Sequence, residues 1–358
     1  MGHPWAKVVA VAALLAGAAD VASAGARADA LPRKASQDES YPGVIVRYDS
    51  IRDPAGNRLR TILTYPRQGG ARFPEIFVTG WLSCDTVEAP PGTTESAQLV
   101  FQSLARLPGF ATARMDKAGV GDSEGECGTT DFIAELAAYR AAFRQLGAYS
   151  FVDPAGIFVF GLSNGGGFAP LVAEGAPVRG YVVVGGWMKS WYEHMLEIER
   201  RRLSLSGHPA AEINPLMKEV ATLYSGYLLA RESPAAIFAR QPELRKYWDG
   251  EHGQQYGRPV AYYQELEDLN LMGAWSAVGV PLLALHGEFD WIMSRDDLES
   301  MVALVNQNAP GAAEFIELPA TGHTLEHYPS LEHAFAFKAL PFDGAIARRI
   351  DDWFTRHR

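Results

Sequence analysis

The chain has 358 residues, of which 47% are hydrophobic and 21% are charged, the composition of an ordinary globular protein. Its formal net charge is −10, and the sequence holds no basic cluster dense enough to bind the phosphates of a nucleic acid. These two properties exclude a disordered chain and a nucleic-acid-binding protein.

The first residues have the pattern of an export signal. Lys7 supplies a positive charge, residues 8–19 form an apolar run, and residues 22–24 read Ala-Ser-Ala, the small-x-small form of a cleavage site. The run is shorter than the about 20 apolar residues that a membrane-spanning helix needs. We therefore predict a signal peptide over residues 1–24 and no stable membrane span after cleavage, with a retained anchor as the alternative. Small-x-small patterns allow cleavage after Ala24, Ala28 or Ala30.

Export bears on the two cysteines, Cys84 and Cys127. In an oxidising compartment an even number of cysteines indicates a disulfide. Two cysteines alone cannot form a structural zinc site, and no pair of histidines has a suitable spacing to them. We predict a disulfide between them and no metal site. The protein is then secreted or periplasmic and begins with a flexible polar lead-in over residues 25–42.

Short apolar runs rich in β-branched residues alternate with amphipathic stretches along the chain. Strands are predicted at residues 44–50, 59–66, 75–80, 110–116, 156–162, 181–186, 281–286 and 313–318. Helices are predicted at residues 96–107, 131–146, 295–305 and 345–354. Most of the strands are near-continuous apolar runs, as in a parallel sheet covered on both faces, and the turn at 54–57 predicts an antiparallel hairpin at the edge. This alternation predicts an α/β fold with a mostly parallel eight-stranded sheet.

The sixth and seventh predicted strands are separated by a segment far longer than a simple crossover. It contains no clear strand and is rich in Tyr, Trp, Glu and Arg. We predict a helical cap over residues 188–272, inserted into a core made of residues 43–187 and 273–358. In the cap, three arginines at 200–202 follow Glu197 at helix ion-pair spacing, which predicts the solvated face of a helix.

The strongest motif follows the fifth predicted strand. Residues 161–165 read Gly-Leu-Ser-Asn-Gly, a G-x-S-x-G pattern between an apolar strand and a helical stretch. The turn is so sharp that side chains at Gly161 and Gly165 would collide with neighbouring backbone, and it lifts Ser163 above the carboxyl edge of the sheet. The N–H of Asn164, at the start of the helix, points toward a developing oxyanion. We predict Ser163 as the nucleophile and Asn164 as an oxyanion-hole donor.

A serine hydroxyl is a poor nucleophile until a base takes its proton. In sheets with this motif the acid and then the histidine follow the serine along the chain, at the carboxyl ends of later strands. Asp290 lies just past the seventh predicted strand, and Glu288 is the alternative acid. His323 lies on a glycine-flanked loop past the last strand, and His327 is the alternative base. The predicted catalytic triad is Ser163, His323 and Asp290.

The second oxyanion donor is expected in the loop after the third predicted strand. Gly80 allows a close approach of the backbone there. The N–H of Trp81 is the preferred donor, and that of Leu82 is the alternative.

Together these motifs resemble the α/β-hydrolase superfamily, in the branch of bacterial esterases and serine-aminopeptidase-like hydrolases. The resemblance also rests on residues 116–123, whose Asp-x-x-Gly-x-Gly-x-Ser pattern is widespread in that superfamily, and it covers residues 44–187 and 275–356. The sequence departs from the common pattern at Thr79, where many members have a histidine before the glycine. The resemblance implies a sheet with helices on both faces and an inserted cap, and it places the loops of Cys84 and Cys127 at the same edge.

A serine hydrolase that cleaves a small-molecule carboxylic ester is the predicted function. We expect no cofactor, because the sequence has no phosphate-binding glycine loop and no ligand cluster. An aminopeptidase, or another amide or thioester hydrolase on the same triad, is the first alternative, and a non-enzymatic binding protein of this fold is the second. An aminopeptidase needs a carboxylate for the substrate's free amine, and four glutamates of the cap could supply it, although surface charge explains them more simply. These residues are Glu193, Glu197, Glu265 and Glu267. The sequence predicts no oligomeric state.

Overall fold

The computed structural model describes residues 31–358 apart from residues 33, 35–37 and 252. The predicted signal peptide over residues 1–24 lies outside the described residues, as does the start of the predicted lead-in. No helix in the described part of the chain has the length and apolar character needed to cross a membrane.

The core is one eight-stranded sheet with the strand order β1-β2-β4-β3-β5-β6-β9-β10. Its strands are β1 (Val44–Arg52), β2 (Arg58–Pro66), β3 (Phe73–Thr79), β4 (Ala111–Met115), β5 (Val152–Leu162), β6 (Gly180–Val184), β9 (Leu282–Gly287) and β10 (Ala313–Leu318). β1 and β2 form an antiparallel hairpin at the edge, β2 also runs antiparallel to β4, and the remaining pairs are parallel. The predicted α/β class with a mostly parallel eight-stranded sheet is confirmed.

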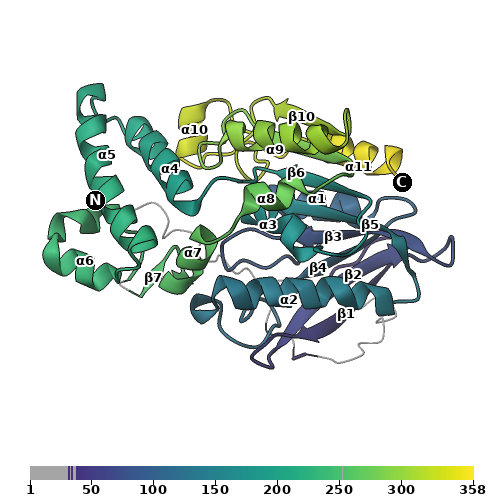
Figure 1. Ribbon diagram of the computed structural model, residues 1–358. Helices are drawn as coiled ribbons and strands as arrows, with labels where there is room; N and C mark the ends of the chain where they lie inside the picture. The colour runs from purple at the N-terminus through teal and green to yellow at the C-terminus, as the bar shows by residue number, and fades with distance from the viewer. Residues whose placement is uncertain (1–30, 33, 35–37, 252) are drawn as a thin grey trace.

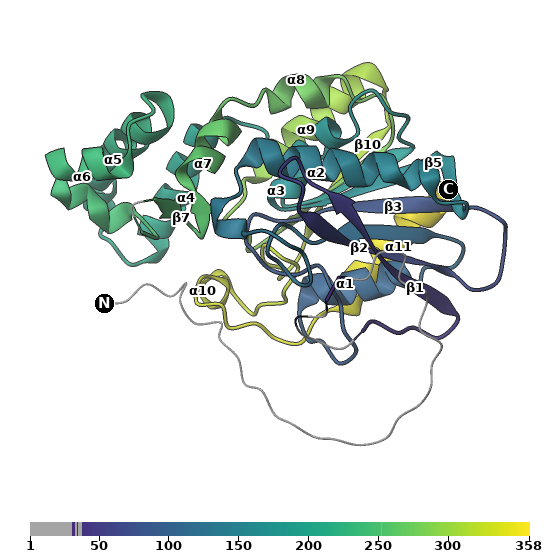
Figure 2. The ribbon, with the colours of Figure 1, turned by 90° about the horizontal axis from the view of Figure 1, so that it is seen from below.

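Helices cover both faces of the sheet (Figures 1 and 2). The first face packs against α2 (Phe132–Gln145), α3 (Asn164–Val172) and α9 (Arg295–Asn308), and the second against α1 (Ser96–Ala105) and α11 (Gly344–Arg356). Side chains alternate along each strand, so the apolar residues of one strand contribute to both layers. In β3, for example, Phe77 packs in the first layer, and Ile76 and Val78 pack in the second.

Side-chain caps fix where the helices begin. The Asp131 carboxylate accepts the N–H of Ala134 at 2.8 Å and starts α2 where the sequence predicts it. The Asp343 carboxylate does the same for Ala345 at the start of α11. Such a side chain satisfies one of the backbone donors that a helix leaves unpaired at its N-terminus.

Between β6 and β9 the chain leaves the sheet and forms a cap, seen on the left of Figure 1. Its helical elements are α4 (Trp191–Leu205), α5 (Ala210–Tyr224), a π-helical turn (Ser225–Leu229), α6 (Pro234–Arg240), a 3₁₀ segment (Pro242–Tyr247), α7 (Val260–Glu267) and α8 (Leu271–Ser276). The indole N–H of Trp275 on α8 donates to the carbonyl of Gly167 on α3, at 3.0 Å. Because of this contact we propose that α8, which crosses the predicted cap boundary at residue 272, belongs to the core.

The prediction of a cap segment without a strand is wrong at one place. β7 (Gln254–Gln255) and β8 (Arg258–Pro259) form a small antiparallel hairpin. Its two turn residues, Tyr256 and Gly257, have φ values of 47° and 75°, the positive values of a type I′ turn. Strands of two residues carry no alternation that a sequence pattern can detect.

The predicted flexible lead-in is not loose at its end. The Glu39 carboxylate forms a buried ion pair with Arg114 of β4, at 2.6 Å, and the hydroxyl of Tyr41 donates to the carbonyl of Ala89 at 3.1 Å. A buried carboxylate needs such a partner. The partner lies far along the chain, so the local composition from which the lead-in was predicted could not reveal it.

Candidate active site

Ser163 lies in the turn between β5 and α3, with φ 58° and ψ −127°. A positive φ is strained for a residue with a side chain, and the neighbouring glycines make it possible. A Cβ at Gly165 would lie 2.3 Å from the carbonyl oxygens of Thr79 and Gly80, and a Cβ at Gly161 would lie 2.6 Å from the Cα of Gly166. The two glycines of the G-x-S-x-G motif therefore have the steric role that the sequence predicts.

The three residues of the predicted triad lie within hydrogen-bonding distance in series. His323 Nε2 is 2.8 Å from Ser163 Oγ, and His323 Nδ1 is 2.9 Å from Asp290 Oδ2. Asp290 follows β9 and His323 follows β10, so residues from three separate segments meet at the carboxyl edge of the sheet. Only 5% of the Ser163 surface is exposed. This geometry is that of an activated nucleophile, its base and the group that orients the base.

The alternative acid and base lie outside this arrangement. The Glu288 carboxylate accepts the N–H of Ala320 at 2.7 Å. His327 forms isolated backbone bridges with Thr321 and Leu340. Both residues therefore organise the loops around the triad.

Electrostatics hold the acid and the base in complementary states. Burial opposes ionisation of Asp290, but the adjacent His323 and the hydrogen bonds to the carboxylate hold the pKa of Asp290 below its usual value. Burial also disfavours the charged form of His323, and the Asp290 carboxylate outweighs burial and raises the pKa of His323. Asp290 is thus an anion at neutral pH, and its charge favours the protonated form of His323.

The loop after β3 lies against the turn that carries Ser163. The Thr79 hydroxyl donates to the carbonyl of Gly165 at 2.9 Å, and the Trp81 ring stacks on Phe101. The side chain of Asn164 is held between Trp187, whose indole N–H it accepts at 2.8 Å, and Tyr262, to whose hydroxyl it donates at 2.9 Å. The two predicted oxyanion donors, Trp81 and Asn164, therefore lie on segments that pack together.

Cys84 and Cys127 are joined in a disulfide, as the sequence predicts. The bond ties the loop after β3 to the 3₁₀ turn at Cys127–Thr129. It closes a loop with a sequence separation of 43, for which the chain-entropy model gives roughly 4 kcal/mol of stabilisation. The guanidinium of Arg258, from the cap, contacts Cys127 Sγ at 2.6 Å and so joins the cap to this bridge.

Lys117, whose role no sequence motif reveals, binds the loop after β3. Its buried ammonium donates to the carbonyl of Trp81, to that of Leu82 at 3.1 Å and to that of Ser83 at 2.9 Å. The Glu135 carboxylate lies 3.7 Å away. Three consecutive carbonyls on one cation fix the course of this loop.

The Asp-x-x-Gly-x-Gly-x-Ser motif forms the frame around Lys117. Asp116 accepts a hydrogen bond from the buried guanidinium of Arg60 at 2.6 Å, and the Ser123 hydroxyl donates back to the carbonyl of Asp116 at 3.3 Å. Gly121, with φ 53°, packs so closely that a Cβ would lie 2.3 Å from Arg60. The motif is structural and sets the position from which Lys117 extends.

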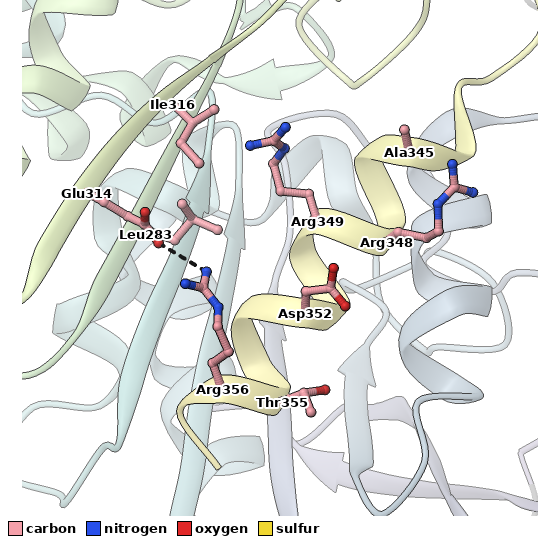
Figure 3. Close-up of a pocket in the computed structure, with 9 residues that line it drawn as sticks. All are labelled: Leu283, Glu314, Ile316, Ala345, Arg348, Arg349, Asp352, Thr355 and Arg356. Atoms are coloured by element: carbon pink, nitrogen blue, oxygen red, sulfur yellow. Dashed lines mark hydrogen bonds and ion pairs between the residues drawn. The ribbon is translucent and has the colours of Figure 1, made fainter.

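A groove of about 750 Å³ lies elsewhere, between α11 and the sheet (Figure 3). It is lined by Leu283 near the start of β9 and by Glu314 near the start of β10, which pairs with Arg356 at 3.5 Å. Asp290 and His323 follow the other ends of these two strands. The groove is therefore separate from the candidate active site.

A family model described as serine aminopeptidase, S33, matches residues 91–337, which include all three triad positions. The chain belongs to this family. The family lies within the α/β-hydrolase superfamily that the motifs resemble, so this prediction is confirmed. No protein in the curated set matches the sequence.

Solved structures of several esterases share the fold of this α/β hydrolase. Est1E from Butyrivibrio proteoclasticus, bound to ferulic acid, has a TM-score of 0.55 and 15% identity, over 87% of this chain and 98% of that chain. Carboxyl esterase 2 from Tuber melanosporum has a TM-score of 0.53 and 14% identity, over 89% and 90%. An esterase from Pyrococcus furiosus has a TM-score of 0.51 and 13% identity, over 91% and 96%. At these identities the likeness establishes the fold alone.

Proposed function

We propose that the protein is a secreted serine hydrolase that cleaves a carboxylic ester through an acyl-enzyme. The observation that carries this proposal is the hydrogen-bonded series from Ser163 through His323 to Asp290. Its position at the carboxyl edge of the sheet and the strained turn at Ser163 support it. Membership of a hydrolase family supports it independently.

In the proposed reaction Ser163 Oγ attacks the ester carbonyl while His323 takes the hydroxyl proton. The carbonyl oxygen becomes an oxyanion, for which the N–H groups of Trp81 and Asn164 are the proposed donors. His323 then gives the proton to the departing alkoxide, which leaves as the alcohol. The acyl group remains on Ser163 as the acyl-enzyme. A water molecule then attacks the acyl-enzyme while His323 takes its proton. The acid is released, and His323 returns the proton to Ser163 Oγ. Asp290 keeps His323 oriented and stabilises its charged form throughout.

The contacts of the four cap glutamates favour an ester over an aminopeptidase substrate. Glu193 forms a capping box with Ser190 at the start of α4, and Glu197 pairs with Lys189. Glu265 accepts the N–H of Ile133 at 2.9 Å, and Glu267 accepts that of Tyr192 at 2.7 Å. Each of the four carboxylates therefore already has a partner within the protein. The aminopeptidase alternative is supported by the family to which the chain belongs, serine aminopeptidase, S33.

The disulfide and the N-terminal pattern support the proposal of export. Disulfides form in secreted and periplasmic proteins and are rare in the cytosol. We propose that residues 1–24 are removed during export. N-terminal sequencing of protein recovered from the periplasm or the medium tests this, and an intact Met1 there would contradict it.

Replacement of the nucleophile tests the proposed function. Ser163→Ala should lower kcat on p-nitrophenyl butyrate by about 10⁴-fold or more, because the triad acts as a unit. The melting temperature should stay close to that of the native protein, since the substitution removes only one hydroxyl group and leaves the packing around Cβ unchanged. A fluorophosphonate should label Ser163 in the native protein and leave the variant unlabelled. Native activity in Ser163→Ala, or equal labelling of both proteins, would refute the assignment.

A further inference from the structure

Arg201 in helix α4 of the cap reaches the loop that carries Asp290. Its Nε donates to the carbonyl of Trp291 at 2.7 Å, and its Nη2 donates to the carbonyl of Ile292 at 2.8 Å. Sequence analysis assigns this arginine to a solvated helix face, where Glu197 is its partner. The ion pair with Glu197 is present at 3.6 Å, but the guanidinium fork is directed to the loop. That part of the prediction is wrong, because backbone carbonyls leave no trace in the side-chain pattern.

The two carbonyls that Arg201 binds belong to the peptide groups that hold the proposed acid. The N–H groups of Ile292 and Met293 both donate to Asp290 Oδ1, each at 2.9 Å. The carbonyl of Trp291 and the N–H of Ile292 are the two ends of one peptide group, and the carbonyl of Ile292 and the N–H of Met293 are the ends of the next. In a trans peptide the carbonyl and the N–H point in opposite directions. Arg201 and Asp290 therefore contact opposite edges of the same two peptide groups.

We propose that Arg201 is a positioning residue for Asp290 and acts through these two peptide groups. This inference rests on the proposed function and adds the cap to it. A bidentate guanidinium fixes the rotation of both peptides, and a cation on the carbonyl side polarises each N–H toward the carboxylate. Asp290 Oδ1 is thereby occupied, and Asp290 Oδ2 faces His323.

The arrangement makes the triad depend on the position of α4. The start of α4 is fixed by its capping box and by Glu267 of α7, which accepts the N–H of Tyr192. Arg201 lies in the later turns of the same helix, about 15 Å along its axis from Trp191 at a rise of about 1.5 Å per residue. A displacement of the cap would withdraw the guanidinium from both carbonyls at once. The hold of Arg201 on the Asp290 loop therefore depends on the seating of α4.

The adjacent arginines supply a matched experiment. Arg200 contacts Asn214 at 3.1 Å, and Arg202 pairs with Glu199. Arg201→Met should lower kcat on p-nitrophenyl butyrate by about 10- to 100-fold, the usual effect of losing a partner that orients a catalytic group, with KM within about twofold. Arg200→Met should match the native protein in both constants. Arg201→Lys should be intermediate, because one ammonium cannot reproduce the planar fork.

A double-mutant cycle separates a positioning role from a purely structural one. In an Asp290→Asn background, Arg201→Met should cause no further loss, since the group on which it acts is already altered. A structural role would make the two losses add. The downfield proton resonance of the His323 Nδ1–H, identified by its absence in His323→Gln, gives a readout without substrate, and it should shift or broaden in Arg201→Met and not in Arg200→Met.

Two results would overturn the inference. One is a kcat and a proton resonance in Arg201→Met equal to those of Arg200→Met. The other is a full additional loss in the Asp290→Asn background. If Arg201→Met does not fold, judged by circular dichroism, the same comparisons are made with Arg201→Lys. Failure of the proposed function looks different, because Ser163→Ala and Asp290→Asn would then keep native activity while the proton resonance still reports on Arg201.

Discussion

At the scale of single residues, the charge of Lys117 depends on pH, and this charge binds the loop that includes Trp81. The pKa of the Lys117 ammonium is lowered to about 8, mainly by burial and also by the nearby Arg258, although Glu135 and Asp85 raise it. Below that pKa the charged group donates to three carbonyls of the loop that includes Trp81. Above it the neutral amine has only two N–H donors and a lone pair, which a carbonyl repels.

We therefore predict that kcat for p-nitrophenyl butyrate falls as the pH rises above about 8, with KM little changed. Lys117→Arg should keep its kcat to higher pH, because guanidinium stays charged. Lys117→Met should have a lower kcat that does not fall in this range. Initial rates, corrected for spontaneous hydrolysis, measure all three. A native kcat that stays level to pH 10 would contradict the role assigned to Lys117.

The residues predictable from sequence are those whose role depends on their immediate neighbours. Ser163 is marked by two glycines, and Asp290 and His323 by their places just past two strands. Lys117 and Arg201 bind main-chain carbonyls of distant loops, and a carbonyl is the same in every residue. The sequence could predict the three side chains that lie within hydrogen-bonding distance of one another, but the residues that bind the loops around them required the structure.

At the scale of the elements, β3 carries a buried acidic side chain, Glu75, that lowers the stability of the protein. Glu75 is fully buried in the sheet, and neither carboxylate oxygen has a hydrogen-bond partner among the described residues. Burial raises the pKa of Glu75 well above its usual value, so the folded protein takes up a proton that the unfolded chain releases. The free energy of unfolding therefore falls as the pH rises from about 4.5 through the raised pKa.

Glu75→Met should accordingly stabilise the protein, by about 1–3 kcal/mol at pH 8 and by less at pH 5. Urea unfolding at the two pH values measures the difference. Glu174→Met is the matched control, because Glu174 is 70% exposed in its pair with Arg140 and should change stability by less than about 0.5 kcal/mol. If Glu75→Met destabilises the protein equally at both pH values, the buried carboxyl group contributes to stability and the prediction is wrong.

The elements themselves follow the sequence where burial is two-sided. β6 and the second half of β5 are nearly continuous apolar runs, because helices cover both faces, and such runs can be recognised in a single sequence. The cap is less predictable. Its elements pack on one another through aromatic contacts such as Trp191 of α4 with Tyr263 of α7, and no motif in the sequence specifies such pairs.

At the scale of the whole molecule, the cap and the core exchange polar contacts around the site. Glu265 of α7 accepts an N–H at the start of α2, and Arg258 of β8 pairs with Glu135 of α2. Tyr262 joins Asn164 to Glu135 through its hydroxyl. Carboxylates at helix N-termini are stabilised by the unpaired backbone N–H groups there. Glu265, Arg258 and Tyr262 thus hold the cap against the core. The use of the Glu265 carboxylate in this contact bears on the choice of substrate.

We predict a higher kcat/KM for p-nitrophenyl butyrate than for aminoacyl p-nitroanilides. Ester cleavage needs the triad and the oxyanion hole, whereas an aminopeptidase also needs a free carboxylate for the substrate's α-ammonium. Glu265→Gln and Glu267→Gln should leave the preference unchanged and lower stability by about 1 kcal/mol each, because each removes a charged acceptor from a helix N-terminus. Thermal unfolding of the two variants measures that loss. If the nitroanilides are instead the better substrates, and either change abolishes the preference, the carboxylate concerned binds the substrate amine and the protein is an aminopeptidase.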